Sequence, residues 1–338
     1  FKKELSQISF DDEFFNFIKK DIFKFVNNFI IYTEDLENNV NQLLKQTKPR
    51  LIIAHQLRML EPAVLGFLAK KMNIEVELIS HGSHTPQSNK YSLYENKFQA
   101  EGLLFSNIAS KVILQSPLAE ETYKYYANKN NFERYKPIMW GYKKSNIANV
   151  YNNKFDLTIL YAGTLKSLGI RPWIYETSNE FFESVKILIN VLKDYNNIEL
   201  IIKARENDEC SISNLLTLTN GYSNCFLESK GDFVDYLEKS DLLISYSSTT
   251  IEEALNYKKP VAIYGYSDRY IHIVEPKLNS KSNLKPVYNL NIKNIKKKLP
   301  MIINSLTNKK VPDNFFNNYV YNNEAKNLSN YITNNIKK

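Results

Sequence analysis

The sequence predicts an α/β protein built from two doubly wound, Rossmann-like domains, each with a parallel sheet covered by helices. Three observations support this prediction. The chain has 338 residues, which is enough for two domains at roughly 150 residues each. Short apolar runs alternate with longer stretches of helical spacing, as in βαβ units. This alternation stops in a polar, Asn-rich stretch over residues 145–154 and then starts again.

The first half is expected to open with a long helix and then to form a sheet. Apolar residues recur at helical spacing from about residue 10 to residue 44. Further helices are expected over residues 62–71 and 118–127. Four short apolar runs are typical of parallel strands that are buried on both faces: 51–54, 76–80, 111–115 and 137–140.

The second half repeats this organisation after the polar stretch. Its helices are expected over 180–192, 233–239 and 250–256, and its strands over 157–161, 198–203, 225–227, 242–245 and 260–264. We therefore expect an N-terminal domain over residues 1–147, a C-terminal domain over residues 148–311, and a last helix within 312–338 that can cross back to the first domain. Two such domains leave a cleft between the carboxyl ends of their sheets, where ligands bind in open α/β proteins.

The composition favours a cytoplasmic protein. A hydrophobic fraction of 43% and a charged fraction of 24% are ordinary for a soluble globular chain. No apolar run approaches the roughly 20 residues that span a bilayer, and no signal peptide is visible. The two cysteines, Cys210 and Cys225, form no metal or redox motif, and idle thiols suit a reducing compartment. The many Asn, Lys and Ile residues indicate an AT-rich bacterial genome, and the start at Phe1 is compatible with a fragment of a longer protein.

The net charge of +8 points to an anionic partner, which can be nucleic acid, a membrane surface or a phosphate-bearing substrate. The basic residues are scattered, with their main cluster over residues 293–298. No RNA-binding or zinc-finger signature accompanies them, so nucleic acid is not expected. The cluster is typical of a solvated helix face, with peripheral contact to anionic lipid at the inner membrane face as the alternative.

The strongest functional signal is a hydroxyl-rich turn between a buried strand and a helix. The strand over 242–245 delivers four hydroxyl side chains to the start of the next helix: Ser247, Ser248, Thr249 and Thr250. Free N–H groups and the positive end of a helix favour a phosphate at such a turn. Capping of the helix by the same side chains is the alternative, and the two roles are compatible. Glu253, one turn into the helix, is expected to face the cleft and to bind a ribose or sugar hydroxyl.

This segment reads Ser-Ser-Thr-x-x-x-Glu-Ala-Leu-x-x-x-Lys-Pro-Val over residues 247–261 and resembles the donor site of GT-B glycosyltransferases. Its adjacent Ser-Ser-Thr is similar to bacterial enzymes of capsule and wall-polymer synthesis, among them Kdo transferases and CDP-glycerol glycerophosphotransferases. The resemblance implies a GT-B fold, with two Rossmann-like domains facing each other across a cleft. It also implies a nucleotide-activated donor that is bound by the C-terminal domain.

Two further strand ends fit a site for the donor phosphates. Residues 159–164 resemble the phosphate-facing turn of the glycerophosphotransferases, although Gly163 stands where a Pro is common there. Gly163 would let the backbone approach a diphosphate and Thr164 would contact it, whereas a plain strand-to-helix turn is the alternative. Lys203 and Arg205 end the next strand, and two cations in a cleft are costly unless an anion meets them.

The N-terminal domain supplies a histidine-rich strand end. Residues 80–86, Ser-His-Gly-Ser-His-Thr-Pro, resemble the Trp-His-Gly-Thr-Pro segment of glycerophosphotransferases, whose His is assigned as the catalytic base. By this match His81 is the base, and its ordinary pKa of about 6.5 suits proton transfer at neutral pH. Ser83 and His84 are an insertion relative to that segment and are expected to bind the acceptor.

Glu61 is the alternative base, because it follows a strand end and should face the same cleft. Arg58 would hold Glu61 or bind the acceptor. A structural role is expected for His55, and a loop carrying His272 is expected to close over the donor. No Asp-x-Asp metal motif is present, which favours a metal-independent reaction without a cofactor.

The sequence thus predicts an inverting glycosyltransferase that moves a sugar from a nucleotide-activated donor to a bacterial surface glycan or lipid-linked glycan. A CMP-activated acid sugar, such as Kdo or a nonulosonate, is the preferred donor. CDP-glycerol transfer, UDP-sugar transfer and a UDP-GlcNAc epimerase-type reaction on the same fold stay open. A non-catalytic, nucleotide-binding scaffold subunit is the alternative from another class.

Overall fold

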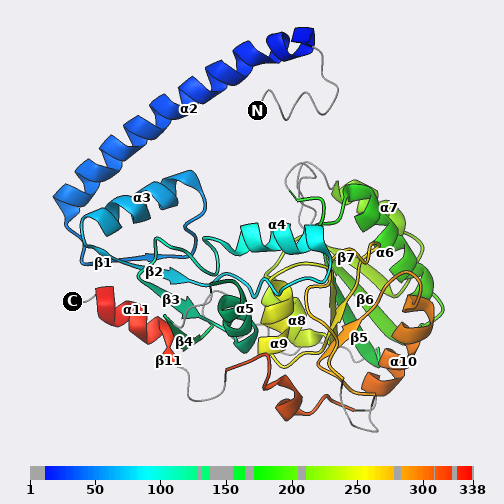
Figure 1. Cartoon of the computed structure of the whole chain (residues 1–338). Coiled ribbons are helices and arrows are strands. Elements are labelled where there is room, and N and C mark those ends of the chain that lie inside the picture. Colours follow the sequence, from blue (N-terminus) through cyan, green and yellow to red (C-terminus); the bar gives the residue numbers. More distant parts are fainter. Residues whose placement is uncertain are drawn as a thin grey trace.

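A computed structural model describes residues 12–127, 131–137, 155–163, 171–204, 211–277, 283–307, 309–321 and 326–336. It contains two parallel sheets, which confirms the predicted α/β class with two doubly wound units (Figure 1). The expected linker over 145–154 and the boundary at residues 147 and 148 lie outside the described residues.

The N-terminal sheet has the order β1-β2-β3-β4-β11, and all of its strands are parallel. Its strands are β1 (Leu51–Ala54), β2 (Glu75–Ile79), β3 (Lys111–Leu114), β4 (Phe132–Lys136) and β11 (Lys326–Asn327). The helices of this half are α2 (Asp12–Thr47), α3 (Leu60–Lys71), α4 (Lys90–Ala100) and α5 (Pro117–Ala127). The fourth strand was expected over residues 137–140, but β4 ends before this run. Of the expected run, only residue 137 is described.

The C-terminal sheet has the order β10-β9-β8-β5-β6-β7. Its strands are β5 (Leu157–Ala162), β6 (Ile198–Lys203), β7 (Cys225–Glu228), β8 (Leu242–Ser245), β9 (Val261–Ile263) and β10 (Val287–Asn289). Its helices are α6 (Ser178–Leu192), α7 (Ile212–Thr219), α8 (Phe233–Lys239), α9 (Thr250–Asn256) and α10 (Ile295–Thr307). The chain adds β6 and β7 on one side of β5 and β8 to β10 on the other, so β5 and β8 flank the point where the strand order reverses.

Alternation along β5 explains why this sheet is buried on both faces. Leu157, Ile159 and Tyr161 pack into one apolar cluster, whereas Leu160 and Ala162 pack into the opposite one. Successive side chains of a strand point to opposite faces, so a continuous apolar run fills two cores at once. The carboxyl ends of β5 and β8 are thereby held rigidly at the edge of the sheet that faces the N-terminal domain.

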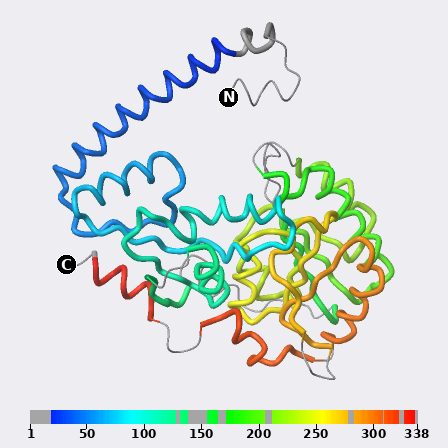
Figure 2. Tube along the Cα trace, viewed as in Figure 1, coloured from blue at the N-terminus to red at the C-terminus, as the bar shows by residue number. Residues whose placement is uncertain are grey.

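The tail returns to the N-terminal sheet, as Figure 2 shows, but not as one long helix. A short 3₁₀ helix (Asp313–Phe316) is followed by β11, which pairs with β4, and by α11 (Leu328–Ile336). The Tyr331 hydroxyl on α11 donates to the buried carboxylate of Glu77 at 2.7 Å. The last helix expected within residues 312–338 is therefore wrong as a single element, because Asp313–Phe316 forms a 3₁₀ helix and Lys326–Asn327 forms a strand before α11.

The helix α2 extends away from the rest of the molecule (Figure 1). Its C-terminal part is anchored, since Leu44 is buried in the N-terminal core and Val40 packs against the same cluster. Among the residues that the structure describes, none of the helices combines the length and apolarity that a membrane crossing requires.

Candidate functional site

A cavity of about 530 Å³ lies between the two domains, where β5 and β8 end. Ligands of doubly wound proteins bind at this kind of reversal in strand order. The C-terminal domain lines it with Gly163 after β5, Lys203 at the end of β6, and the turn after β8. The N-terminal domain lines it with residues 81–84, which follow β2. The cavity therefore joins most of the residues that the sequence singled out.

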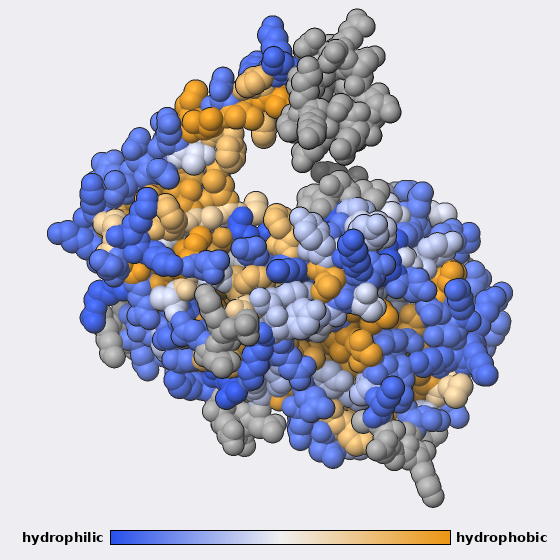
Figure 3. Space-filling model, in the orientation of Figure 1, coloured by the Kyte–Doolittle hydropathy of each residue, from blue (hydrophilic) through white to orange (hydrophobic). Residues whose placement is uncertain are grey.

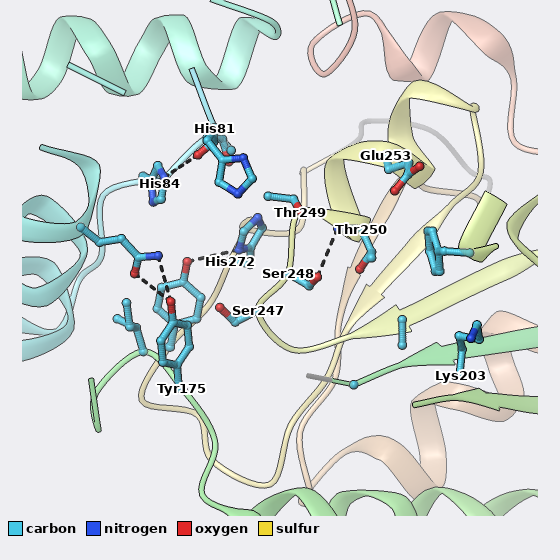
Figure 4. A pocket seen from close by; sticks show the side chains of 18 of the residues that line it. His81, His84, Tyr175, Lys203, Ser247, Ser248, Thr249, Thr250, Glu253 and His272 are labelled. Atoms are coloured by element: carbon cyan, nitrogen blue, oxygen red, sulfur yellow. Dashed lines mark hydrogen bonds between the residues drawn. The ribbon is translucent and has the colours of Figure 1, made fainter. Parts of the chain in front are cut away.

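The hydroxyl turn over residues 247–250 forms one wall (Figure 4). The Ser245 hydroxyl donates to the Ala162 carbonyl at 2.8 Å, which ties the ends of β8 and β5 together. Capping accounts for only part of the turn: Ser248 Oγ accepts from the Thr250 N–H at 3.3 Å, whereas Thr249 makes no side-chain cap. The buried Thr250 Oγ1 has no hydrogen-bond partner among the described residues. Helix capping therefore does not use all of the hydroxyl groups of this turn.

The cationic side of the wall is described only in part. Lys203 lines the cavity, and its ammonium group lies 5.5 Å from the centre of the Tyr236 ring. Thr164 and Arg205 lie outside the described residues. Gly163 is required for packing, because a Cβ at this position would lie 1.9 Å from the Phe181 ring. The structure thus gives Gly163 the structural role that was expected as the alternative, since it leaves room for the Phe181 ring. This role does not depend on any ligand.

The opposite wall is the loop after β2, which carries His81. Its Gly82 has a left-handed φ of 78°, and a Cβ there would lie 3.4 Å from the Thr249 methyl group. A glycine lets the loop adopt this φ and approach the hydroxyl turn closely. His81 therefore faces residues 247–250 across the cavity, as Figure 4 shows.

His84 fixes the backbone of this loop. It is buried, and burial lowers its pKa to about 4, so the ring is neutral at physiological pH. Its Nε2 lies 2.6 Å from the His81 carbonyl oxygen. Since a carbonyl only accepts, Nε2 carries the proton and donates. This contact makes His84 a residue that orients His81, although its ring also lines the cavity where an acceptor was expected to bind.

Glu252, which the sequence did not single out, joins the two domains. Its side chain is buried on α9, and Oε1 accepts from the Ser83 N–H at 2.9 Å and from the Ser83 hydroxyl at 2.7 Å. His272 Nε2 lies 3.0 Å from the same oxygen. Burial raises the pKa of Glu252, but the His272 charge and the hydrogen bonds from His272 and Ser83 outweigh it and lower the pKa to about 2.

His272 also lines the cavity, so three of the four histidines of the chain meet there. Its Nδ1 lies 3.2 Å from the Tyr270 hydroxyl, and its carbonyl accepts from the Thr85 hydroxyl. Gln87 exchanges hydrogen bonds with the backbone of Ile271 at 2.9 and 3.1 Å. The loop over residues 81–87 is therefore attached to the C-terminal domain along most of its length.

A second contact between the domains lies beside the cavity. The Tyr91 ring on α4 stacks on Trp173 at 4.6 Å between centroids, and Gln99 exchanges hydrogen bonds with the Tyr175 hydroxyl at 2.9 and 3.1 Å. Arg269 fixes the segment that carries Tyr175, because its guanidinium group donates hydrogen bonds to the Glu180 carboxylate and to the Tyr175 carbonyl. Gln99 and Tyr175 also line the cavity.

The structure does not bring Glu61 and Arg58 to this cavity. Glu61 is exposed at the start of α3 and accepts a hydrogen bond from the Tyr32 hydroxyl on α2 at 3.0 Å. Arg58 lines a different hollow, next to Gly102 and Phe98. His55 is exposed. Among the residues that the structure describes, no group of three or more His, Cys, Asp or Glu side chains is arranged to hold a metal ion.

Comparison with solved structures identifies the fold as GT-B-like. The UDP-GlcNAc 2-epimerase of Methanocaldococcus jannaschii, in complex with UDP-GlcNAc and UDP, is similar with a TM-score of 0.57 at 13% identity over 89% of this chain and 80% of that one. The Neisseria meningitidis UDP-GlcNAc 2-epimerase bound to UDP-GlcNAc has a TM-score of 0.55 at 12% identity, over 90% and 81%. The glycotransferase of kitacinnamycin has a TM-score of 0.51 at 11% identity, over 84% and 74%.

These likenesses establish the GT-B architecture that the resemblance at residues 247–261 implied. No protein-family model matches the chain, and no curated protein matches it.

Proposed function

We propose that the chain is an enzyme that acts on a nucleotide-activated sugar, and that it transfers the sugar by a metal-independent, inverting reaction. The observation that supports this proposal is the cavity at the strand reversal, where Lys203 and the hydroxyl turn face His81 of the other domain. Hydroxyls and an ammonium group bind phosphate oxygens, whereas a histidine accepts a proton. Binding and proton transfer thus lie on opposite walls of one cavity.

In the proposed reaction His81 takes the proton of an acceptor hydroxyl while that oxygen attacks the donor carbon. The bond from this carbon to the phosphate oxygen breaks, and the nucleotide leaves with the bonding pair. Lys203 and the hydroxyls of residues 247–250 stabilise the negative charge that develops on the leaving phosphate. The neutral His84 keeps the His81 backbone in place during this step.

Glu253 lines the same cavity and is proposed to bind a ribose or sugar hydroxyl of the donor. A CMP-activated acid sugar is our preferred donor, because the segment over residues 247–261 is similar to capsule Kdo transferases. CDP-glycerol and UDP-sugars are the alternatives. The acceptor is proposed to be a surface glycan or a lipid-linked glycan, which would place the enzyme at the cytoplasmic face of the membrane.

UDP-GlcNAc 2-epimerisation is the second candidate, and the structural neighbours favour it. Two of the compared structures are UDP-GlcNAc 2-epimerases that hold UDP-GlcNAc. Three histidines around one cavity would also suit a reaction that removes and returns a proton on a sugar. An epimerase needs no acceptor, and this difference separates the two candidates experimentally.

Binding of nucleotides tests the site first. Thermal shifts are measured with CMP, CDP, UDP, UDP-GlcNAc and a CMP-activated sugar, on the wild type and on Ser248→Ala and Lys203→Ala. A ligand at a hundredfold its Kd adds about 2.7 kcal/mol of stability. We expect one nucleotide class to stabilise the wild type and to lose this effect in both variants. Matched controls are Ser305→Ala and Lys186→Ala on α10 and α6, which should keep the shift.

The reaction itself is tested with the nucleotide sugar that binds. Conversion of UDP-GlcNAc without an acceptor, with deuterium taken up from D₂O, would establish the epimerase and refute the transferase. Release of the nucleotide only when a glycan acceptor is added would establish the transferase. Stabilisation without turnover in either assay would favour a nucleotide-binding scaffold, and no response to any nucleotide would refute the proposed site.

A further inference from the structure

Three buried side chains at the cavity have no part in the reaction proposed above: Tyr270, His272 and Glu252. They are 4%, 6% and 3% exposed, and the first two line the cavity. The apolar side chains on the outer half of α2, orange in Figure 3, are exposed, whereas these three polar groups are enclosed where the two domains meet. Buried polar groups need partners, and their hydrogen bonds determine what each group can do.

The three side chains form one chain of hydrogen bonds. The Tyr270 hydroxyl lies 3.2 Å from His272 Nδ1, and His272 Nε2 lies 3.0 Å from Glu252 Oε1. The first of these contacts is the dashed line at His272 in Figure 4. Ser247, which begins the hydroxyl turn, lies beside the Tyr270 hydroxyl. The chain therefore runs from the wall proposed for the donor phosphates to a buried carboxylate.

The charge on Glu252 determines where the protons lie. Its pKa of about 2 makes it a carboxylate at neutral pH, so its oxygen only accepts and His272 Nε2 carries a proton. A buried charge is costly without a counter-charge. Among the described residues that hydrogen-bond to Glu252, Ser83 is neutral and His272 alone can be cationic. We therefore expect an imidazolium, whose Nδ1–H donates to the Tyr270 oxygen and leaves the phenol proton for an acceptor in the cavity.

Tyr270 alone would be a weak proton donor. Burial raises the pKa of Tyr270 well above its ordinary value, so the phenol keeps its proton at neutral pH. The His272 imidazolium changes this, because it can replace the phenol proton in the same step. No phenolate then forms in a buried site, and the proton is lost in effect by the imidazolium, which is a much stronger acid.

We infer that Tyr270 is a second catalytic residue, which protonates the leaving phosphate oxygen and is supplied with a proton through His272 and Glu252. The inference rests on the proposed transfer. As the bond from the donor carbon to the phosphate oxygen breaks, this oxygen keeps the bonding pair and takes the phenol proton. Tyr270 takes the Nδ1 proton of His272, which becomes neutral and keeps its hydrogen bond to Glu252. His81 has gained one proton from the acceptor and His272 has lost one, and both exchange protons with water after the nucleotide leaves.

Steady-state kinetics with the nucleotide sugar that binds test the role of Tyr270. Tyr270→Phe removes only the hydroxyl, and we expect kcat to fall by a factor on the order of 10² to 10⁴ while the nucleotide Kd stays within about threefold. The matched control is Tyr246→Phe. The Tyr246 ring is also buried and packs edge-on against Tyr270 at 5.9 Å between centroids, but it does not line the cavity, so kcat should stay unchanged.

Nitrogen-15 NMR of histidine-labelled protein tests the proton positions without any turnover. At pH 7 both ring nitrogens of His272 should carry a proton in the wild type and in Tyr270→Phe, and the ring should be neutral in Glu252→Gln. The signal is assigned with His272→Gln. A neutral His272 in the wild type would overturn the inference.

The kinetic outcomes separate this inference from the proposed function. If the wild type turns over and Tyr270→Phe is as active as Tyr246→Phe, the role of Tyr270 is refuted and the proposed transfer stands. If the wild type binds nucleotides and turns over none of their sugars, both are refuted.

Discussion

Replacing Glu252 tests whether the two domains are joined as the structure shows. Its Oε1 accepts two hydrogen bonds from Ser83 and lies 3.0 Å from His272 Nε2, within a buried environment. In Glu252→Gln the amide oxygen can still accept these bonds but without the negative charge that strengthens them, and the amide NH2 group replaces the buried Oε2, which has no hydrogen-bond partner among the described residues. Hydrogen bonds to charged groups contribute about 1.5–3 kcal/mol each, and leaving a buried donor unpaired adds a cost.

The pKa of Glu252 gives an independent magnitude. It falls from an ordinary 4.5 to about 2 on folding, which corresponds to about 3 kcal/mol of stability. Because the folded pKa is the lower one, this stability is fully present above pH 4.5. It is lost as the pH falls toward 2, where the carboxylate is protonated in the folded state as well.

Urea unfolding at pH 7 and at pH 3 measures the stability that Glu252 contributes and the dependence of this contribution on pH. At pH 7 we expect Glu252→Gln to unfold with about 3 kcal/mol less free energy than the wild type, and the difference should shrink at pH 3. The matched control is Glu121→Gln, which removes an exposed carboxylate on α5 and should change stability by less than about 0.5 kcal/mol. Equal stabilities of the two variants at pH 7 would refute the role of Glu252.

Three further predictions concern the site and the core around it. His81→Ala should lower kcat by a factor on the order of 10² to 10⁴ while the nucleotide Kd stays within about twofold. Glu61→Gln should leave turnover intact, and the reversed pattern in steady-state kinetics would make Glu61 the base. Burial raises the pKa of Glu176 to about 7, so wild-type stability should fall from pH 4.5 to pH 7, and Glu176→Gln should remove this fall of about 3 kcal/mol in urea titrations. Gly163→Ala should destabilise the protein by about 1–3 kcal/mol through its clash with the Phe181 ring, and Phe181→Leu in the same chain should recover part of the loss in a thermal melt.

The alternation of strands and helices could be predicted because it depends on local patterns. Buried parallel strands are apolar at nearly every position, as β5 and β8 are, and short turns separate them from the helices. The helix α4 was missed for a physical reason. Its exposed face carries Tyr94 and Phe98, and its contacts with the C-terminal domain use Glu95 and Gln99, so it lacks an apolar stripe. The strand β10 was not predicted either.

The parts of the site that lie on one continuous segment could be predicted, whereas the contacts between the two domains could not. The hydroxyl turn and the His81 loop each follow a strand end, so the cleft between two sheets was enough to bring them together. Glu61 also follows a strand end, but α3 begins there and its carboxylate turns toward Tyr32. Sequence position fixes the edge of the sheet on which a residue lies and leaves the direction of its side chain open.

The neighbouring carboxylates Glu252 and Glu253 show this limit most clearly. Residues one apart on a helix point about 100° from each other, so only one of them can face the cavity. The structure turns Glu253 to the cavity and Glu252 to Ser83 of the other domain. His81 is two residues from Ser83, and its loop adopts a left-handed φ at Gly82. The position of the proposed base therefore depends on a carboxylate of the opposite domain, so the site is complete only while the two domains are in contact.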